Sequence, residues 1–424
     1  MYKKEILPNG LRIVSHEMKD RDSVALGFWF NAGGRYEEDH IKGAAHFLEH
    51  MVFKGSQKYA CEEIKQLIEG VGGSLNAFTA EEQTCYHAKI PAKHFDQTFD
   101  VLADMAFFPN MKTEELNKEK TVIMEEIKMY HDIPQYHVME LLDGLVWPNH
   151  PLGKSLAGTV ESVGSTTKEN LSDFHKTYYG AGNAAIVACG KISHTKLVQA
   201  AKRKLGRAAG SAGKGFIKAV NAQSAPRLNL HKKDIEQMHL ALGMLGYNQF
   251  QKERYVLSLL SVILGGNMSS RLFVEVREKH GLAYSISSYN KPLADTGIFL
   301  IKAGVDNQRL TQALGLILKE LERIKAANVG QEEFKRAREY VIGQILLGLE
   351  DTMEHMIWMG ESLMSRNRLH TRHEVVNELK KITPSDVRRV AKHILDPKRF
   401  NLALIGPLTN DQEKEIHSLF GIRN

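Results

Sequence analysis

The sequence predicts an α+β protein of two related domains, each a mostly antiparallel sheet with helices packed on one face. A chain of 424 residues is too long for one core and suits two domains of about 200 residues each. A Gly-rich stretch lies near the middle, and the order of elements before it partly repeats after it. We therefore expect a domain over residues 1–207, a flexible linker over 208–216 and a related domain over 217–424.

Composition is that of an ordinary globular protein, with 43% hydrophobic and 25% charged residues. The net charge of +6 is spread along the chain without a basic block, so we expect no nucleic acid partner. We expect no membrane partner, because no stretch approaches 18 uncharged apolar residues and the N-terminus lacks a signal-like apolar region. Cys61, Cys85 and Cys189 form no C-x-x-C pair, which predicts reduced core thiols and a cytoplasmic location.

The first half begins with a turn at Pro8-Asn9-Gly10 between two short strands, followed by an apolar strand over residues 23–31. The motif helix described below comes next. The other expected elements are a helix at 61–69, strands at 74–80 and 83–90, helices at 92–107, 113–132, 135–146 and 168–178, a strand at 183–189 and a helix at 193–205.

Beyond the linker the pattern partly returns. Residues 237–246 resemble the apolar strand of the first half, and a helix at 254–264 follows it as the motif helix follows its strand. The other expected elements are a strand pair at 281–289 and 296–304, two or three helices within 308–365 and a strand at 401–405. The second half has no counterpart of the motif below, so we expect one metal site per chain.

The motif is the stretch His46-Phe47-Leu48-Glu49-His50, within an apolar run that Gly55 ends, which predicts a buried helix. His46 and His50 are four residues apart and project from one helix face, where each can give a nitrogen to Zn²⁺. Glu49 is a natural general base for a metal-bound water. The order His-x-x-Glu-His is the reverse of the common zinc-protease motif.

The alternative is a polar helix face whose groups are satisfied by neighbouring side chains. The flanking residues are apolar, and three ionisable groups on such a helix are costly without a metal or partner. We therefore favour the metal site.

A third ligand is needed, because catalytic zinc sites commonly have three protein ligands. Glu119 and Glu126 are seven residues apart and share one face of the helix expected over 113–132. One can bind the metal while the other orients a ligand histidine. Equally, both can be solvated charges on a helix rich in Lys and Glu.

The run HFLEHMVFKG resembles the zinc helix of the pitrilysin-type inverzincins, in particular small bacterial members similar to the mitochondrial processing peptidase. The resemblance covers essentially the whole chain. The family has its third ligand, a Glu, about 75 residues past the second His, and 75 residues lie between His50 and Glu126 here. The resemblance implies that Glu126 is the ligand, that Glu119 supports the site and that the adjacent Glu125 has neither role.

Two further features follow from the resemblance. Arg277 and Tyr284 match an Arg/Tyr pair that the family uses near the scissile bond, where they can stabilise an oxyanion. Without the resemblance they indicate a helix-end Arg and a strand Tyr packed in a sheet. The segment Asn76-Ala77-Phe78-Thr79-Ala80 resembles the edge strand that binds an extended substrate, for which we select Asn76, Ala77 and Phe78. Without the resemblance it is only a strand after a Gly turn.

One departure concerns the Gly-rich loop that mitochondrial enzymes carry on a partner subunit. Here the comparable place holds only residues 264–267, and one chain carries both the zinc motif and the Arg/Tyr pair. This suggests a homodimer in which each chamber takes zinc from one protomer and Arg277 and Tyr284 from the other. It also argues against presequence-type specificity.

The sequence therefore predicts a zinc metalloendopeptidase that hydrolyses peptides or unfolded segments in a closed chamber. His46, His50 and Glu126 hold Zn²⁺, and Glu49 is the base. We choose Zn²⁺ over Mn²⁺ or Co²⁺ because of the chemical preference of N,N,O ligands, since no residue identifies the metal directly. The alternative is a non-catalytic scaffold or assembly subunit of the same fold. A hydrolase with another substrate on the same site ranks third.

Overall fold

The computed structural model describes residues 2–220 and 222–422, which form two compact units. The first unit comprises Met1–Met129, Lys154–Ile217 and Leu346–His370. The second comprises Tyr130–Gly153, Lys218–Ile345 and Thr371–Asn424. Each unit draws on both halves of the sequence, so the units are not the two halves that the predicted boundaries at 207 and 217 describe.

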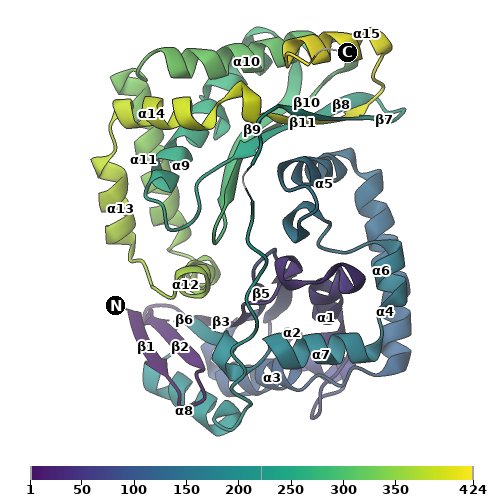
Figure 1. Ribbon diagram of the computed structural model, residues 1–424. Helices are drawn as coiled ribbons and strands as arrows, with labels where there is room; N and C mark the ends of the chain where they lie inside the picture. The colour runs from purple at the N-terminus through teal and green to yellow at the C-terminus, as the bar shows by residue number, and fades with distance from the viewer. Residues whose placement is uncertain (1, 221, 423–424) are drawn as a thin grey trace. The chain divides into compact units, whose positions relative to one another are not determined.

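The first unit is built on a six-stranded sheet in the order β1-β2-β6-β3-β5-β4. Figure 1 labels β1, β2, β6, β3 and β5 of this sheet. Only β2 and β6 pair in parallel. Gly10, with a positive φ of 88°, closes the predicted turn between β1 and β2. The strands are β1 (Tyr2–Ile6), β2 (Arg12–Glu17), β3 (Ser23–Phe30), β4 (Ser74–Thr79), β5 (Thr84–Pro91) and β6 (Ala184–Gly190).

Helices cover one face of this sheet, where alternate residues such as Leu26, Phe28 and Phe30 of β3 enter the main core. The bounds predicted for α4 and α7 are confirmed, whereas α6 was not predicted. The helices are α1 (Ala44–Val52), α2 (Cys61–Glu69), α3 (Phe95–Phe107), α4 (Thr113–Asp132), α6 (Val160–Ser165), α7 (Lys168–Tyr178) and α8 (His194–Leu205).

The opposite face of the same sheet is covered by α12 (Thr352–Arg366), which comes from the second half of the sequence. Met356 and Met359 of α12 pack with Trp29 of β3 and Val187 of β6, all fully buried. Because Trp29 alternates with the core-facing residues of β3, this apolar cluster lies behind the sheet. Helices were predicted on one face of the sheet, and the structure adds α12 on the other face.

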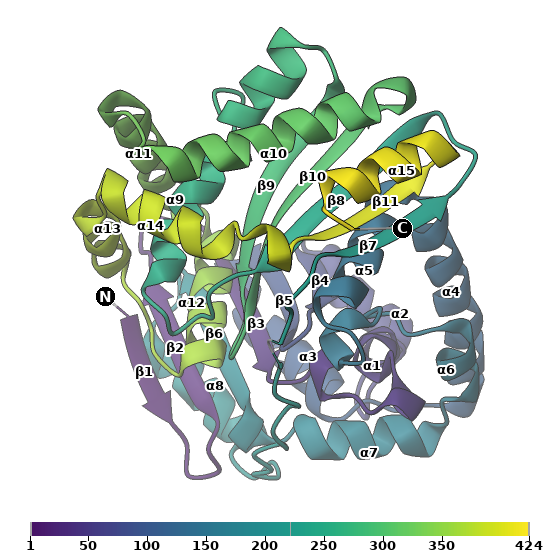
Figure 2. The same ribbon diagram turned by 45° about the horizontal axis from the view of Figure 1, so that its top comes forward.

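The second unit holds a five-stranded sheet in the order β7-β11-β8-β10-β9, with β7 and β11 parallel and the other pairs antiparallel (Figure 2). In chain order, this is the same arrangement as β2-β6-β3-β5-β4 of the first unit. The predicted class, two related and mostly antiparallel α+β domains, is confirmed. The strands are β7 (Arg227–Lys232), β8 (Gln237–Leu245), β9 (Ala283–Pro292), β10 (Gly297–Asp306) and β11 (Asn401–Gly406).

A helix from the first half of the sequence packs on this second sheet. Val138 and Leu142 of α5 (Pro134–Val146) meet Ala241 of β8 and Ile405 of β11. On the same unit, α9 packs against β9, and α14 packs against α9. The remaining helices are α9 (Glu253–Gly265), α10 (Leu310–Ala326), α11 (Gln331–Gly348), α13 (Arg372–Lys381), α14 (Pro384–Ile394) and α15 (Asn410–Leu419).

The predicted linker is packed rather than loose. Ala209 O accepts a hydrogen bond from Ala181 N at 2.8 Å, and Ser211 Oγ donates to Thr177 O at 3.0 Å. The segment therefore belongs to the first unit, and the change of unit falls after Ile217.

All three cysteines are free, as predicted. Cys85 and Cys189 are buried, but Cys61 is only half-buried at the start of α2, so it is not the core thiol that was expected. No helix within residues 2–220 and 222–422 has the length and apolar character needed to cross a membrane.

The packing of α12 on the first sheet predicts a pair of contrasting Gly→Ala effects. A Cβ at Gly360 of α12 would lie 2.1 Å from Trp29 Cε2, so Gly360→Ala should destabilise the protein by about 1–3 kcal/mol. Gly343 of α11 has open space around its Cβ position, so Gly343→Ala should be neutral or stabilise by up to ~1 kcal/mol. Urea unfolding followed by circular dichroism measures both, and a Gly360→Ala variant as stable as wild type would contradict this packing.

Candidate metal centre

The two motif histidines lie on α1, whose apolar side is buried in the core of the first unit. Phe47, Leu48 and Met51 are fully buried, whereas His46 and His50 are half-buried on the adjoining face. Their ring centroids are 4.8 Å apart, as expected for side chains one helical turn apart. The apolar side thus fixes the helix and leaves both imidazoles directed away from the core.

The carboxylate of Glu126, on α4, approaches both imidazoles. Its Oε2 lies 3.4 Å from Nε2 of His50 and 3.8 Å from Nε2 of His46. These three residues offer donor atoms that all lie within 4.8 Å of one another, the one such group of His, Cys, Asp and Glu among the described residues. Two helices distant in the sequence therefore bring together the predicted N,N,O donor set.

Glu119 binds His50 through the ring nitrogen that does not face Glu126. Its Oε2 accepts a hydrogen bond from His50 Nδ1 at 3.0 Å, and its Oε1 pairs with Lys54 Nζ at 2.6 Å. With the proton on Nδ1, a neutral His50 presents the lone pair of Nε2 to the Glu126 carboxylate. Two acceptors that face each other need a proton or a cation between them, and with Nε2 of His46 close by the residues present fit a divalent metal ion.

The two imidazoles differ in their protonation. Burial, helped by the neighbouring His50, lowers the pKa of His46 to about 4, which keeps its ring neutral near pH 7. Burial also lowers the pKa of His50, but hydrogen bonds to Glu126 and Glu119 and their charges outweigh it and raise that pKa above its ordinary value. A proton and a metal ion therefore compete for the position between His50 and Glu126.

Glu49 lies on the same helix and is held from another strand. Thr79 Oγ1, at the end of β4, donates a hydrogen bond to Glu49 Oε2. The pKa of Glu49 is raised chiefly by burial, which the hydrogen bond from Thr79 opposes. A carboxylate whose pKa is raised is a stronger base than an ordinary one and is better suited to accept a proton. Thr79 was expected only as part of the substrate strand, and its bond to Glu49 was not predicted, because only folding brings the two residues together.

The predicted substrate strand is β4, which lies at the end of the first sheet and pairs with β5 alone among the described strands. Asn76 is exposed, Ala77 packs against the main core and Phe78 lies against Trp29 with ring centroids 5.5 Å apart. An unpaired edge offers the backbone groups that an added strand would use.

Arg277 and Tyr284 belong to the second unit. Arg277 lies on a short π-helix, η6 (Phe273–Lys279), a helical form that is frequent at functional sites. Its Cζ lies 5.6 Å from the centroid of the Tyr284 ring, and Tyr284 is 75% exposed. The two side chains are thus neighbours, and the exposed Tyr is not packed in the sheet as the simpler alternative supposed.

Comparison with known families gives two matches. Residues 12–160 match the family described as "Insulinase (Peptidase family M16)", and residues 165–341 match "Peptidase M16 inactive domain". The second span contains no His-x-x-Glu-His. The chain belongs to the M16 peptidase family, and the predicted resemblance to pitrilysin-type metallopeptidases is confirmed.

Individual relatives agree over nearly the full length. The chain is 34% identical over 421 residues to an uncharacterized zinc protease of Streptomyces coelicolor, covering 98% of this chain and 92% of that protein. It is 36% identical over 415 residues to an uncharacterized zinc protease of Bacillus subtilis, covering 97% and 99%. The names of these relatives imply zinc as the metal.

Solved structures share the fold. A protease from Helicobacter pylori matches with a TM-score of 0.90 at 24% identity, over 96% of this chain and 99% of that chain. A peptidase M16 inactive domain from Pseudomonas fluorescens matches with a TM-score of 0.89 at 20% identity, over 96% of this chain and 98% of that chain. Complex III2 from Candida albicans matches with a TM-score of 0.83 at 18% identity, over 98% of this chain and 99% of that chain.

The neighbouring glutamates of α4 predict opposite results for zinc content. Glu126→Gln should lose bound zinc, because an amide is a far weaker ligand than a carboxylate. Glu125→Gln should keep it, because Glu125 is exposed and its carboxylate pairs, within the described part of the chain, with Lys128 at 2.6 Å. Elemental analysis of both purified proteins tests this, and equal zinc content would exclude Glu126 as a ligand.

Proposed function

We propose that this protein is a zinc-dependent endopeptidase that hydrolyses peptides or unfolded segments of polypeptides. The observation that carries the proposal is the meeting of His46, His50 and Glu126, with Glu49 on the same helix. Zinc-protease relatives that align along almost the whole chain support it.

His46, His50 and Glu126 would hold the metal ion. When bound, Zn²⁺ would supply Lewis-acid chemistry that polarises a peptide carbonyl and makes water easier to deprotonate. Glu49 takes the proton from the attacking water and delivers it to the nitrogen of the departing amine. Thr79 keeps one carboxylate oxygen of Glu49 fixed, which leaves the other for this transfer.

An extended peptide is the substrate form that this unit suits. The peptide pairs with the free edge of β4 along Asn76, Ala77 and Phe78, and that strand ends at Thr79, the hydrogen-bond partner of the base. Pairing along a strand requires unfolded backbone, so folded proteins are excluded as substrates.

Arg277 and Tyr284 complete the reaction by stabilising the oxyanion that forms when water adds to the carbonyl. The protein acts as a homodimer in which this pair serves the zinc site of the partner chain. The pair's proximity and the exposure of Tyr284 support its availability for this role.

A non-catalytic scaffold is the second candidate, because one match is described as inactive and the fold recurs in Complex III2 from Candida albicans. The donor set of the first unit and the raised pKa of Glu49 favour the peptidase. Cleavage of an unstructured peptide that a chelator stops and added zinc restores would exclude the scaffold.

Glu49→Gln should separate metal binding from turnover. The variant keeps both histidines and Glu126 and should retain zinc, but it cannot accept a proton, so kcat should fall by a factor on the order of 10³ or more. Cleavage of an unstructured fluorogenic peptide measures kcat, with Glu125→Gln as the matched control. Turnover at the wild-type rate in zinc-loaded Glu49→Gln would disprove the role of the base.

Mixing two inactive variants tests the shared chamber. Glu49→Gln and Tyr284→Phe damage different halves of the proposed site, so a mixed dimer has one intact chamber. After subunit exchange, activity should recover to about a quarter of wild type, since half of the dimers are mixed. Exchange confirmed by mass spectrometry without recovery would show that the pair does not act across the dimer.

A further inference from the structure

The beginning of α1 has an unusual cap. Its N-cap residue, Gly43, has a positive φ of 95°, and a Cβ there would lie 2.6 Å from Ala157 O. No side chain therefore fits at the position that normally caps a helix. The free N–H groups of the first turn must be satisfied by another residue.

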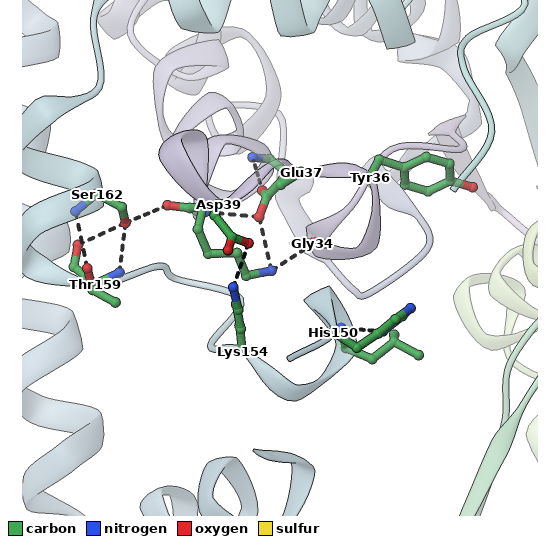
Figure 3. A network of polar contacts seen from close by, with 12 residues as sticks. Gly34, Tyr36, Glu37, Asp39, His150, Lys154, Thr159 and Ser162 are labelled. Atoms are coloured by element: carbon green, nitrogen blue, oxygen red, sulfur yellow. Dashed lines mark hydrogen bonds and ion pairs between the residues drawn. The ribbon is translucent and has the colours of Figure 1, made fainter. Parts of the chain in front are cut away.

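That residue is Glu37, in the preceding loop. Its Oε2 accepts a hydrogen bond from Gly43 N at 2.9 Å, and its Oε1 accepts one from Ala45 N at 2.7 Å (Figure 3). Both carboxylate oxygens thus bind the backbone of the first turn of the helix that carries the histidines. Such charge-assisted bonds are stronger than bonds between neutral groups and fix direction.

The Glu37 carboxylate is itself held in place by a buried cation. Glu37 is 1% exposed and Lys42 is 4% exposed, and Lys42 Nζ lies 3.1 Å from Glu37 Oε2. Lys42 Nζ also donates to Gly34 O at 2.8 Å, and its backbone O accepts from Ser162 Oγ of α6 at 2.7 Å. A buried ion pair is costly to form and weak evidence of a stabilising role, so its position at this turn calls for another explanation.

The two histidines differ in what orients them. His50 is held through Nδ1 by Glu119, whereas the Nδ1 of His46 is buried and has no hydrogen-bond partner within residues 2–220 and 222–422. The placement of His46 therefore depends on its backbone and on packing. Ala45, whose N–H binds Glu37, is the residue directly before His46.

We propose that Glu37, together with Lys42, is a positioning residue for His46. It fixes the first turn of α1 and thereby aims an imidazole whose Nδ1 has no hydrogen-bond partner among the described residues. The inference rests on the proposed zinc site and adds a second support to it: Glu119 orients His50 through its ring, and Glu37 orients His46 through the backbone.

The experiment measures zinc affinity of folded apoprotein by competition with a chromophoric chelator. Glu37→Gln replaces one acceptor oxygen by an NH₂ group and should weaken zinc binding by about 10–100-fold, the usual effect of losing a residue that supports a ligand. Asp39→Asn is the matched control: Asp39 lies two residues away, is exposed and pairs with Lys154 at 2.5 Å. Its zinc affinity should stay within about twofold of wild type.

The charge-neutral double variant Glu37→Gln/Lys42→Met is the second test, because it leaves no unpaired buried charge. It too should bind zinc about 10–100-fold more weakly than wild type while remaining folded by circular dichroism. A folded variant of either kind with wild-type zinc affinity, or a failure of both to fold, would overturn the positioning role. Wild-type protein that binds no zinc would instead overturn the proposed function.

Discussion

The proposed metal site depends on the approach of two helix faces, one carrying two imidazoles and the other two carboxylates. Neither face is suited to burial by itself, because half-buried ionisable groups are costly without compensation. The buried apolar residues of α1 hold the helix against the core, and the larger ones contribute about 1.5–3 kcal/mol each (Phe47, Leu48, Met51 and Val52). The core thus fixes the position of α1. The carboxylates of α4 offset the cost of keeping the imidazoles of α1 half-buried. A divalent cation is the natural completion of this arrangement.

Around this contact, separate elements orient each reacting group. Glu119 of α4 binds His50, and Thr79 of β4 binds Glu49, the proposed general base. Because Thr79 also ends the edge strand, the element proposed to receive the substrate is linked directly to the carboxylate proposed to activate water. Substrate position and base position are therefore set by the same strand.

Much of this could be predicted from local patterns. The His-x-x-Glu-His spacing indicated the metal, apolar periodicity gave α4 and α7 with their observed bounds, and the repeated order of strands gave two related sheets. The spacing of Glu119 and Glu126 placed them on one helix face, but only the resemblance distinguished them from solvated charges.

Other features could not be predicted, because they arise from contacts between distant segments. Helix α12, from the second half of the sequence, packs on the first sheet, and α5, from the first half, packs on the second sheet. Neither placement leaves a local signal, since both are ordinary amphipathic helices. Glu37 stands in the charged stretch Glu37-Glu38-Asp39, which has the composition of a solvated loop, yet it is the residue of the three that is buried. Burial of such a charge depends on its partner, and the sequence does not say which acidic residue finds one.

X-ray anomalous scattering at the zinc edge, from crystals of the zinc-loaded protein, tests the central claim most directly. We expect one strong peak per chain, within bonding distance of Nε2 of His46, Nε2 of His50 and a carboxylate oxygen of Glu126. Zinc bound elsewhere, with this position empty and Glu126 turned away from both rings, would contradict it.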